Sequence, residues 1–373
     1  MIGVEGKYIF TFSIGDKKDF IIENDLVNFL LVEETGNVMP TFELIFKCED
    51  EKILTYLNEG NNLNVSFGKN KDNMIDGSFR ITRLIPTRSG ESKYIIKVIG
   101  LYSALGYLKD NIDIKEGSGV EVISQVVSEY FETDFNISSS TDSQKWIQHN
   151  IPNKKFVDNV WMHSYIPDSF ICVGITSDGR FVLRDMKLLA GDNYKYRFTV
   201  SPENDNDIYF DGDYVPDDQS GFINYYLGYG RQKHVYTLED GTESDILEDT
   251  DILLSLTNKL SRSSDIDKRI ASVGMQNDNV HENYWKAFYK NMQSLVIFDS
   301  TKITFSFINK FIPIKVLDLI MFNEKEINRN DASEFYSGKY FVKKVARSIS
   351  NGTFSTTLQV CRESFGGTRG DLR

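Results

Sequence analysis

Apolar and polar residues alternate through most of the N-terminal third of the chain, which is typical of strands that bury one face. The strands expected there cover residues 8–14, 42–46, 63–67, 79–81 and 94–98. One stretch, residues 50–60, instead has apolar residues at helical spacing, and Gly60 is placed to close that helix. A glycine turn at residues 87–90 separates the last two strands. We therefore expect an antiparallel β-barrel domain over residues 1–107.

The spacing changes after Ser118, which is placed as the N-cap of a helix. Apolar residues then recur every four positions as far as Tyr130, which predicts an amphipathic helix. A second helix is predicted from about Asn153 until Pro167 stops it. The apolar runs 170–175 and 181–183 flank a Ser-Asp-Gly turn and predict a hairpin. These elements indicate a mixed α+β domain over residues 108–200.

The C-terminal part combines acidic loops, one long helix and a last block of strands. Residues 201–218 and 239–251 are acidic and irregular, with a strand-like run at 222–228 between them. A helix is predicted at 278–298, followed by strands at 303–307, 316–322, 338–347 and 353–360. We expect a second β-barrel from residues 201–237 with 299–363, an acidic and helical insertion at 238–298, and a short tail at 364–373. The predicted fold class is α+β and β-rich.

Two hairpins at opposite ends of the chain resemble each other. Residues 77–84 and 338–345, separated by 261 positions, each begin with glycine and continue with aromatic, β-branched and basic residues at alternate positions. Counting from the turn glycines aligns Tyr94 with Thr356, Ile96 with Leu358 and Val98 with Val360. Two related tube-like barrels would give a cyclic trimer six similar units around one axis. The alternative is that any two amphipathic hairpins look alike.

Composition excludes several classes of protein. The 42 basic and 54 acidic residues give a net charge of −12, the wrong sign for a general nucleic-acid binder. No apolar run is long enough to cross a bilayer, so no stable membrane insertion is expected. No secretory leader is expected either, because residues 1–7 lack a basic start followed by an apolar run. Cys48, Cys172 and Cys361 lie far apart and suggest neither a disulfide framework nor a metal site. We expect synthesis in a reducing compartment.

Residues that could carry chemistry are few. The four histidines (His149, His163, His234, His281) show no metal-ligand spacing, and motifs for a serine nucleophile or a phosphate loop are missing. The aspartates of residues 205–218 could bind a hard cation, but a solvated acidic loop is preferred because a calcium-loop pattern is lacking. The aromatic residues around Trp285 are expected in the core. We predict no enzyme, no cofactor and no metal.

Three segments carry a resemblance to a known family: residues 155–161 leading into 170–185, residues 283–288, and residues 337–345 with the Asn351-Gly352 turn. In their order and spacing they resemble the baseplate hub subunit of contractile-tailed bacteriophages of the T-even type. That fold is shared with the hub region of type VI secretion spike proteins. The resemblance implies a homotrimeric ring that adapts a six-fold tail tube to a three-fold central spike. Because only residues 364–373 follow the last strand, the spike is expected to be a separate chain.

The resemblance also implies partners and a place in the virion. Expected partners are the spike, the tail tube or its initiator, and possible wedge and tape-measure proteins, with DNA only passing through the channel. The strand residues expected to build the assembly are Phe79, Ile81, Tyr94, Ile96, Val98, Tyr340, Val342, Thr356, Leu358 and Val360. Two alternatives stay open: a cell-wall-degrading enzyme, since fifty-four acids make some carboxylate pair inevitable, and a host-glycan-binding β-protein. A phage hub and a phage-derived injection particle are not distinguished.

Overall fold

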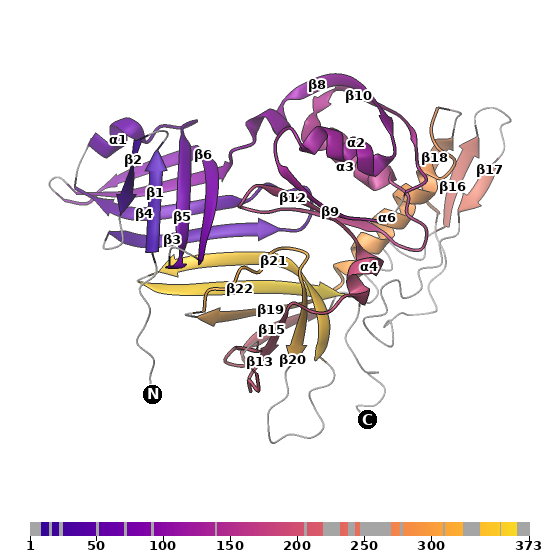
Figure 1. Cartoon of the computed structure of the whole chain (residues 1–373). Helices are drawn as coiled ribbons and strands as arrows, with labels where there is room; N and C mark the ends of the chain where they lie inside the picture. The colour runs from indigo at the N-terminus through magenta and orange to yellow at the C-terminus, as the bar shows by residue number, and fades with distance from the viewer. Residues whose placement is uncertain are drawn as a thin grey trace.

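One large open sheet dominates the computed structural model (Figure 1). Its hydrogen-bonded path runs β14-β13-β20-β21-β3-β4-β7-β6-β5-β1-β2, with β22, β19 and β15 continuing from β21. The structure describes residues 9–14, 17–21, 25–49, 52–70, 73–90, 93–138, 140–204, 207–218, 232–237, 243–246, 270–276, 279–308, 310–323, 336–350 and 352–363. The expectation of a β-rich chain with few helices is confirmed at this level.

The N-terminal strands pack around a phenylalanine-rich core. They are β1 (Ile9–Ile14), β2 (Lys17–Ile21), β3 (Leu26–Glu34), β4 (Thr41–Cys48), β5 (Asn62–Asn70), β6 (Asn73–Arg88) and β7 (Tyr94–Tyr102), with the helix α1 (Lys52–Tyr56). All of their pairings are antiparallel. Buried residues alternate with more exposed ones in β1, β3, β4 and β7. Rings such as Phe42 and Phe79 therefore meet in the core, with centroids 4.9 Å apart and planes tilted by 58°. We call β3 to β7 the first strand module.

The middle of the chain forms an α+β unit at the upper right of Figure 1. It contains η1 (Leu105–Leu108), β8 (Asp110–Gly117), α2 (Gly119–Val127), β9 (Glu132–Asn136), β10 (Gln144–Pro152), α3 (Asn153–His163), β11 (Ile171–Ile175), β12 (Arg180–Asp185) and α4 (Met186–Gly191). Ser118 caps α2 as predicted, in a reciprocal capping box with Glu121. The predicted hairpin is confirmed as β11 and β12, and β9 joins it in parallel.

The C-terminal strands form a second group below the first in Figure 1. They are β13 (Tyr196–Thr199), β14 (Asp207–Tyr209), β15 (Tyr214–Asp218), β19 (Thr301–Ile308), β20 (Leu319–Asn323), β21 (Gly338–Ser350) and β22 (Thr353–Arg362). We call β15 and β19 to β22 the second strand module. The helix α6 (Tyr284–Phe298) packs against α3 of the middle unit.

Several expectations need correction. The two end modules are not closed barrels but parts of one open sheet. The strand β16 (Gln232–Thr237), expected in the second module, pairs with β17 (Glu243–Ile246) and β18 (Ile270–Gln276) instead. The strand-like run at 222–228 and the tail at 364–373 lie outside the described residues. In the part of the chain that is described, no helix combines the length and apolar character needed to span a membrane.

Candidate assembly site

The two strand modules have the same strand order and the same strand directions. The first runs β3-β4-β7-β6-β5 across the sheet, and the second runs β15-β19-β22-β21-β20. Every neighbouring pair in both series is antiparallel. Because the chain also visits the strands in the same sequence order, each element of the first module has one counterpart in the second. The similarity therefore extends beyond a single hairpin.

Local irregularities recur at matching positions in the two modules. The ladder of β6 and β7 shifts between Ile81 and Arg83, and that of β21 and β22 shifts between Val342 and Lys344. These bulges are 261 residues apart, the separation of the sequence repeat. Such bulges re-aim a strand and are specific features of a sheet. Their recurrence favours two related modules over two chance look-alike hairpins.

A residue with positive φ precedes the adjacent strand in both modules. Gly60 has φ 85° and its N–H donates to the carbonyl of Ile81 at 2.8 Å. Leu317 has φ 66° and its N–H donates to the carbonyl of Val342, also at 2.8 Å. A leucine in this region carries a steric cost that glycine avoids, so its conformation is imposed by the surrounding sheet.

Strands β7 and β22, the second strands of the two repeated hairpins, align differently from the alignment inferred by counting from the turn glycines. Val98 lies opposite Leu84, and Leu358 lies opposite Val345. Val98 therefore corresponds to Leu358 and not to Val360, because the connection between β21 and β22 is shorter than that between β6 and β7. Turn glycines alone do not fix a register when loop lengths differ.

The strand residues expected to build the assembly line the interiors of the modules. In the first core, Phe79, Ile81, Ile96 and Val98 are buried and Tyr94 is partly buried. In the second module, Tyr340, Val342, Thr356, Leu358 and Val360 are all buried. Their side chains hold each module together, and contact with another chain would be made by other positions of the same strands. The involvement of these strands in assembly stays a prediction.

Strand β3, which was not predicted from the sequence, joins the first module to β21 of the second. The C-terminal half of β21, from Lys344 to Ser350, pairs antiparallel with β3. The N-terminal half of β21 pairs with β20, so the two halves of one long strand serve different neighbours on the same edge. In Figure 1 the yellow β21 lies directly beneath β3. The modules are therefore fused edge to edge by backbone hydrogen bonds.

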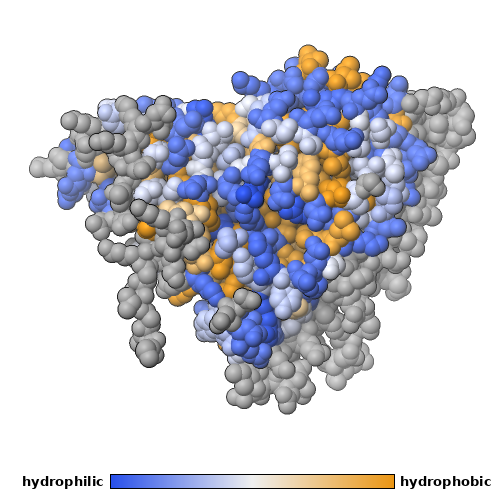
Figure 2. All heavy atoms as spheres, in the orientation of Figure 1, coloured by the Kyte–Doolittle hydropathy of each residue, from blue (hydrophilic) through white to orange (hydrophobic). Residues whose placement is uncertain are grey.

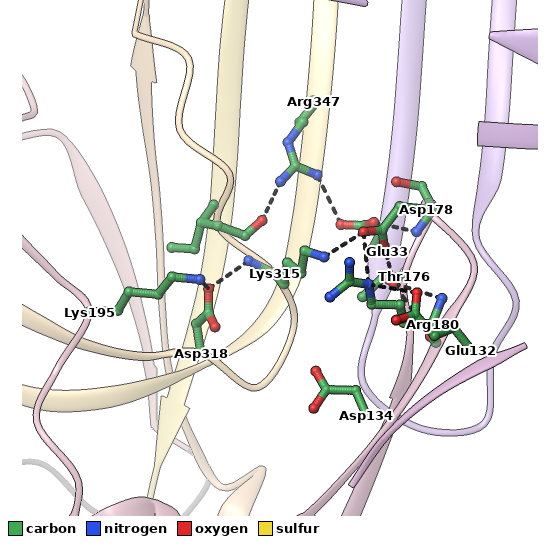
Figure 3. Close-up of polar contacts among 12 residues, drawn as sticks. Glu33, Glu132, Asp134, Thr176, Asp178, Arg180, Lys195, Lys315, Asp318 and Arg347 are labelled. Atoms are coloured by element: carbon green, nitrogen blue, oxygen red, sulfur yellow. Dashed lines mark hydrogen bonds and ion pairs between the residues drawn. The ribbon is translucent and has the colours of Figure 1, made fainter. Parts of the chain in front are cut away.

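A buried ion pair lies at the centre of this junction (Figure 3). The Nη1 of Arg347 donates to a carboxylate oxygen of Glu33 at 2.9 Å, and both side chains are at most 3% exposed. The other oxygen of Glu33 accepts the backbone N–H of Ser177 at 2.6 Å, and Nη2 of Arg347 donates to the carbonyl of Ile314. The pair thus links β3, β21, the β11–β12 turn and the segment before β20. Buried charges persist where such partners satisfy them.

Charged side chains continue from this pair toward the surface. Lys315 donates to Asp178 at 2.6 Å, and Lys195 donates to Asp318 at 3.0 Å. Burial opposes ionisation of Asp178, but the hydrogen bonds from Lys315 and Thr176 hold the pKa of its carboxyl below its ordinary value. Beside them is a cavity of about 560 Å³ between β9, β12 and the segment before β20. Its charged lining residues are Asp134, Arg180, Arg184, Asp192, Lys195, Lys315 and Asp318. These opposite charges pair mainly with one another.

Two solved structures with a similar fold are described as tail proteins. A tail protein from Neisseria meningitidis MC58 matches with a TM-score of 0.61 and 7% identity, over 96% of this chain and 97% of that chain. The 43 kDa tail protein of prophage MuSo2 from Shewanella oneidensis matches with a TM-score of 0.59 and 10% identity, over 95% and 98%. This chain shares their fold.

A secretion-system protein has the same fold. The E. coli c3393 protein, a component of the type VI secretion system described as structurally similar to the T4 bacteriophage tail proteins gp27 and gp5, matches with a TM-score of 0.53 and 10% identity. The match covers 95% of this chain and 77% of that one. No protein-family model and no curated protein sequence matches the chain. At these identities the comparisons establish the tail-protein fold.

His163 serves packing between α3 and α6. His163 is buried between the rings of Tyr284 and Phe288, with centroids 3.8 and 5.0 Å away. Its Nδ1 lies 2.8 Å from the carbonyl of Asn159, and burial lowers its pKa to about 4. Within the described ranges no group of three His, Cys, Asp or Glu side chains is arranged to hold a metal ion. As expected for the aromatic helix, α6 contributes its rings to the interface with α3.

The acidic loop is more structured than expected. Asp207 is buried, and its carboxylate accepts the N–H of Glu203 at 2.8 Å and that of Asn204 at 3.1 Å. These hydrogen bonds, with nearby Arg197, lower its pKa. Asp207 therefore closes a turn before β14 and is not a solvated side chain. Asp205 lies outside the described residues.

The two-stranded ribbon of β8 and β10 presents apolar side chains to solvent. Ile112, Ile114 and Ile147 are 75%, 64% and 49% exposed, and Ile114 lies opposite Ile147 in the ladder. Figure 2 shows hydrophobic residues at the top of the molecule, where Figure 1 places this ribbon. Neither strand of this ribbon was predicted from the sequence.

Proposed function

We propose that the chain is a structural tail protein, the baseplate hub of a contractile phage tail or of a related injection particle. Three copies form a ring in which each chain contributes two strand modules. Six similar modules around the axis match the symmetry of a six-fold tube, while the three middle units present three-fold symmetry to a central spike.

The observation that carries this proposal is the duplication of the strand module. The two modules share strand order, bulge position and the positive-φ residues Gly60 and Leu317. They are also joined edge to edge through β3 and β21. A chain built as two copies of one unit, placed side by side, is suited to a ring with twice as many units as chains. The shared fold with tail proteins supports the same role.

The two faces of the proposed ring suggest where its partners bind. The tail tube or its initiator would stack on the six modules, and the spike would dock on the opposite face, with wedge and tape-measure proteins around or within. DNA would pass through the channel during ejection without stable binding. The net charge of −12 suits this passage if carboxylates line the channel, because they repel phosphates. A neutral or basic channel in the assembled particle would remove that part of the proposal.

The test is the oligomeric state and symmetry of the purified protein. Light scattering and cryo-electron microscopy of the chain, alone and co-expressed with a candidate spike protein, are expected to show a three-fold ring with six similar modules. A protein that stays monomeric in both preparations would refute the proposal. Peptidoglycan zymography and glycan binding by the isolated chain are expected to be negative, and lysis by this chain alone would favour an enzyme.

A further inference from the structure

Two strand edges that are paired with each other inside the chain have counterparts that are unpaired among the described residues. The half of β21 from Lys344 to Ser350 pairs with β3 in the same chain. Its counterpart in the first module, residues 83–88 at the end of β6, pairs on one side with β7 and has no strand on the other side among the described residues. Likewise β15, the counterpart of β3, pairs with β19 alone in the part of the chain that is described. Among the described strands there is thus one open edge on β6 and one on β15.

The register of β15 against β3 follows from the shared ladder. In the first module, Phe29 of β3 lies opposite Leu44 of β4, which lies opposite Val98. In the second, Tyr214 of β15 lies opposite Phe305 of β19, which lies opposite Leu358. Since Leu358 corresponds to Val98, Tyr214 corresponds to Phe29.

The junction inside the chain therefore specifies a pairing between the open edges. Ser348 lies opposite Leu30 within the chain. Its counterpart Thr87 would lie opposite Val215, the counterpart of Leu30. By the same rule, Arg88 would face Tyr214, because Ile349 faces Phe29.

Side chains at the junction of β3 and β21 are buried, whereas their counterparts on the open edges of β15 and β6 are exposed. Leu31 and Ile349 are 1% and 5% exposed where β3 and β21 meet. Their counterparts Pro216 and Arg88 are exposed, and Val215 is 67% exposed. Positions that are covered in the closed junction are thus open to solvent in the other, which leaves apolar surface for a partner to bury.

The chemistry of the two edges is complementary. The open part of β6 carries Arg83 and Arg88, whereas β15 and the residue before it carry Asp213 and Asp217. In the transferred register, Arg83 and Asp217 are diagonal neighbours on one face, a distance that long side chains span. Proline is confined to edge strands because it cannot donate a hydrogen bond, and both edges contain one. Pro86 would face Pro216, so the ladder would lack hydrogen bonds there and would be held by the pairs on either side.

We propose that residues 84–88 of β6 in one copy pair antiparallel with β15 in the next copy, with Thr87 opposite Val215. The occupant of each open edge is a second copy of this chain. The contact is heterologous, because each copy offers one edge of each kind, and such contacts close into a ring when the rotation per unit fits. This inference rests on the proposed ring and names the surfaces through which its members join.

Disulfide trapping tests the pairing in the full chain. A Thr87→Cys, Val215→Cys double variant is made in a Cys48→Ser background, since the other two native cysteines are buried. Mild oxidation is expected to give species of two and three linked chains on non-reducing gels and none larger. Facing residues of an antiparallel pair lie within the distance that a disulfide spans.

Matched variants separate the possible outcomes. Each single-cysteine variant can link no more than two chains, and Thr87→Cys with Pro216→Cys points the thiols to opposite faces and is expected to link at least tenfold less. Equal yields from the in-register and out-of-face pairs would overturn the assigned register. A trimer by light scattering that gives no linked species would overturn this interface while leaving the hub proposal intact. A protein that is monomeric alone and with its spike would refute both.

Discussion

The buried ion pair between Arg347 and Glu33 predicts a large loss of stability when the arginine alone is removed. In Arg347→Met the aliphatic part of the side chain is kept, but the carboxylate of Glu33 stays buried with only the N–H of Ser177 as partner. Removing one member of a buried pair typically costs about 3–5 kcal/mol. At about 2–4 °C per kcal/mol, the melting temperature of the unit that contains the junction is expected to fall by roughly 6–20 °C.

A neighbouring pair on the same two strands provides the control. Lys344 and Glu34 also lie opposite each other across β21 and β3, 3.5 Å apart, but their side chains are 40% and 36% exposed. Exposed pairs contribute about 0–1 kcal/mol, so Lys344→Met should shift the melting temperature by only a few degrees. Differential scanning calorimetry of both variants makes the comparison. If Arg347→Met is no less stable than Lys344→Met, the reasoning from burial is wrong.

Three smaller predictions concern single groups. The pKa of His163 is about 4 in the folded protein and near 6.5 when unfolded, so the free energy of unfolding should fall by roughly 3 kcal/mol as the pH drops from about 6.5 to about 4. Unfolding measured as a function of pH should lose this dependence in His163→Phe. The control variant His149→Gln, at an exposed site, should keep it. Gly60→Ala should cost about 1 kcal/mol in chemical denaturation, although no atom lies near the added methyl, because φ is 85°; Gly191→Ala, equally uncrowded and without positive φ, should not be destabilised. Maleimide labelling followed by mass spectrometry should modify Cys48 alone in the native protein and all three cysteines in denaturant, and rapid native labelling of a second thiol would contradict their burial.

Much of the fold could be predicted because its strands follow the simple rule of alternation. The segments with regular alternation, such as Ile9–Ile14 and Thr301–Ile308, are strands with one buried face. Helices with clear caps were equally accessible, since Ser118 begins α2 as its spacing predicts. The repeat was visible for the same reason, because the alternation within each strand is local. Whether a sheet closes into a barrel depends on pairings between distant strands, and the expectation of two closed barrels was wrong.

The junction could not be predicted, because its signals are distributed over the chain. The strand Leu26–Glu34 reads as a nearly continuous apolar run, which does not distinguish a strand from a buried helix. Its Glu33 looks like any surface carboxylate until Arg347, more than three hundred residues away, is placed beside it. The open edges were hidden too, because they are recognised only by comparing each strand with its counterpart in the other module.

The ion pair between Glu33 and Arg347 is also expected to fix the alignment of β21 against β3. A buried pair often contributes little net stability compared with apolar replacements, but it can specify one alignment of the strands that carry it. In the double variant Glu33→Gln with Arg347→Met no charge is left unpaired, so most of the loss seen in Arg347→Met should be recovered. Strand β21 would then lack its fixed point against β3 and could slip by two residues without changing faces.

Disulfide trapping within one chain reads the alignment directly. Ser348→Cys with Leu30→Cys joins residues that face each other in the native register, whereas Ala346→Cys with Leu30→Cys joins residues shifted by two. With the ion pair intact, only the first pair is expected to close efficiently. Without it, the shifted pair should gain at the expense of the native one. Unchanged yields at both pairs in the double variant would mean that the bulge and the strand core fix the register alone, and that Arg347 and Glu33 are retained for stability.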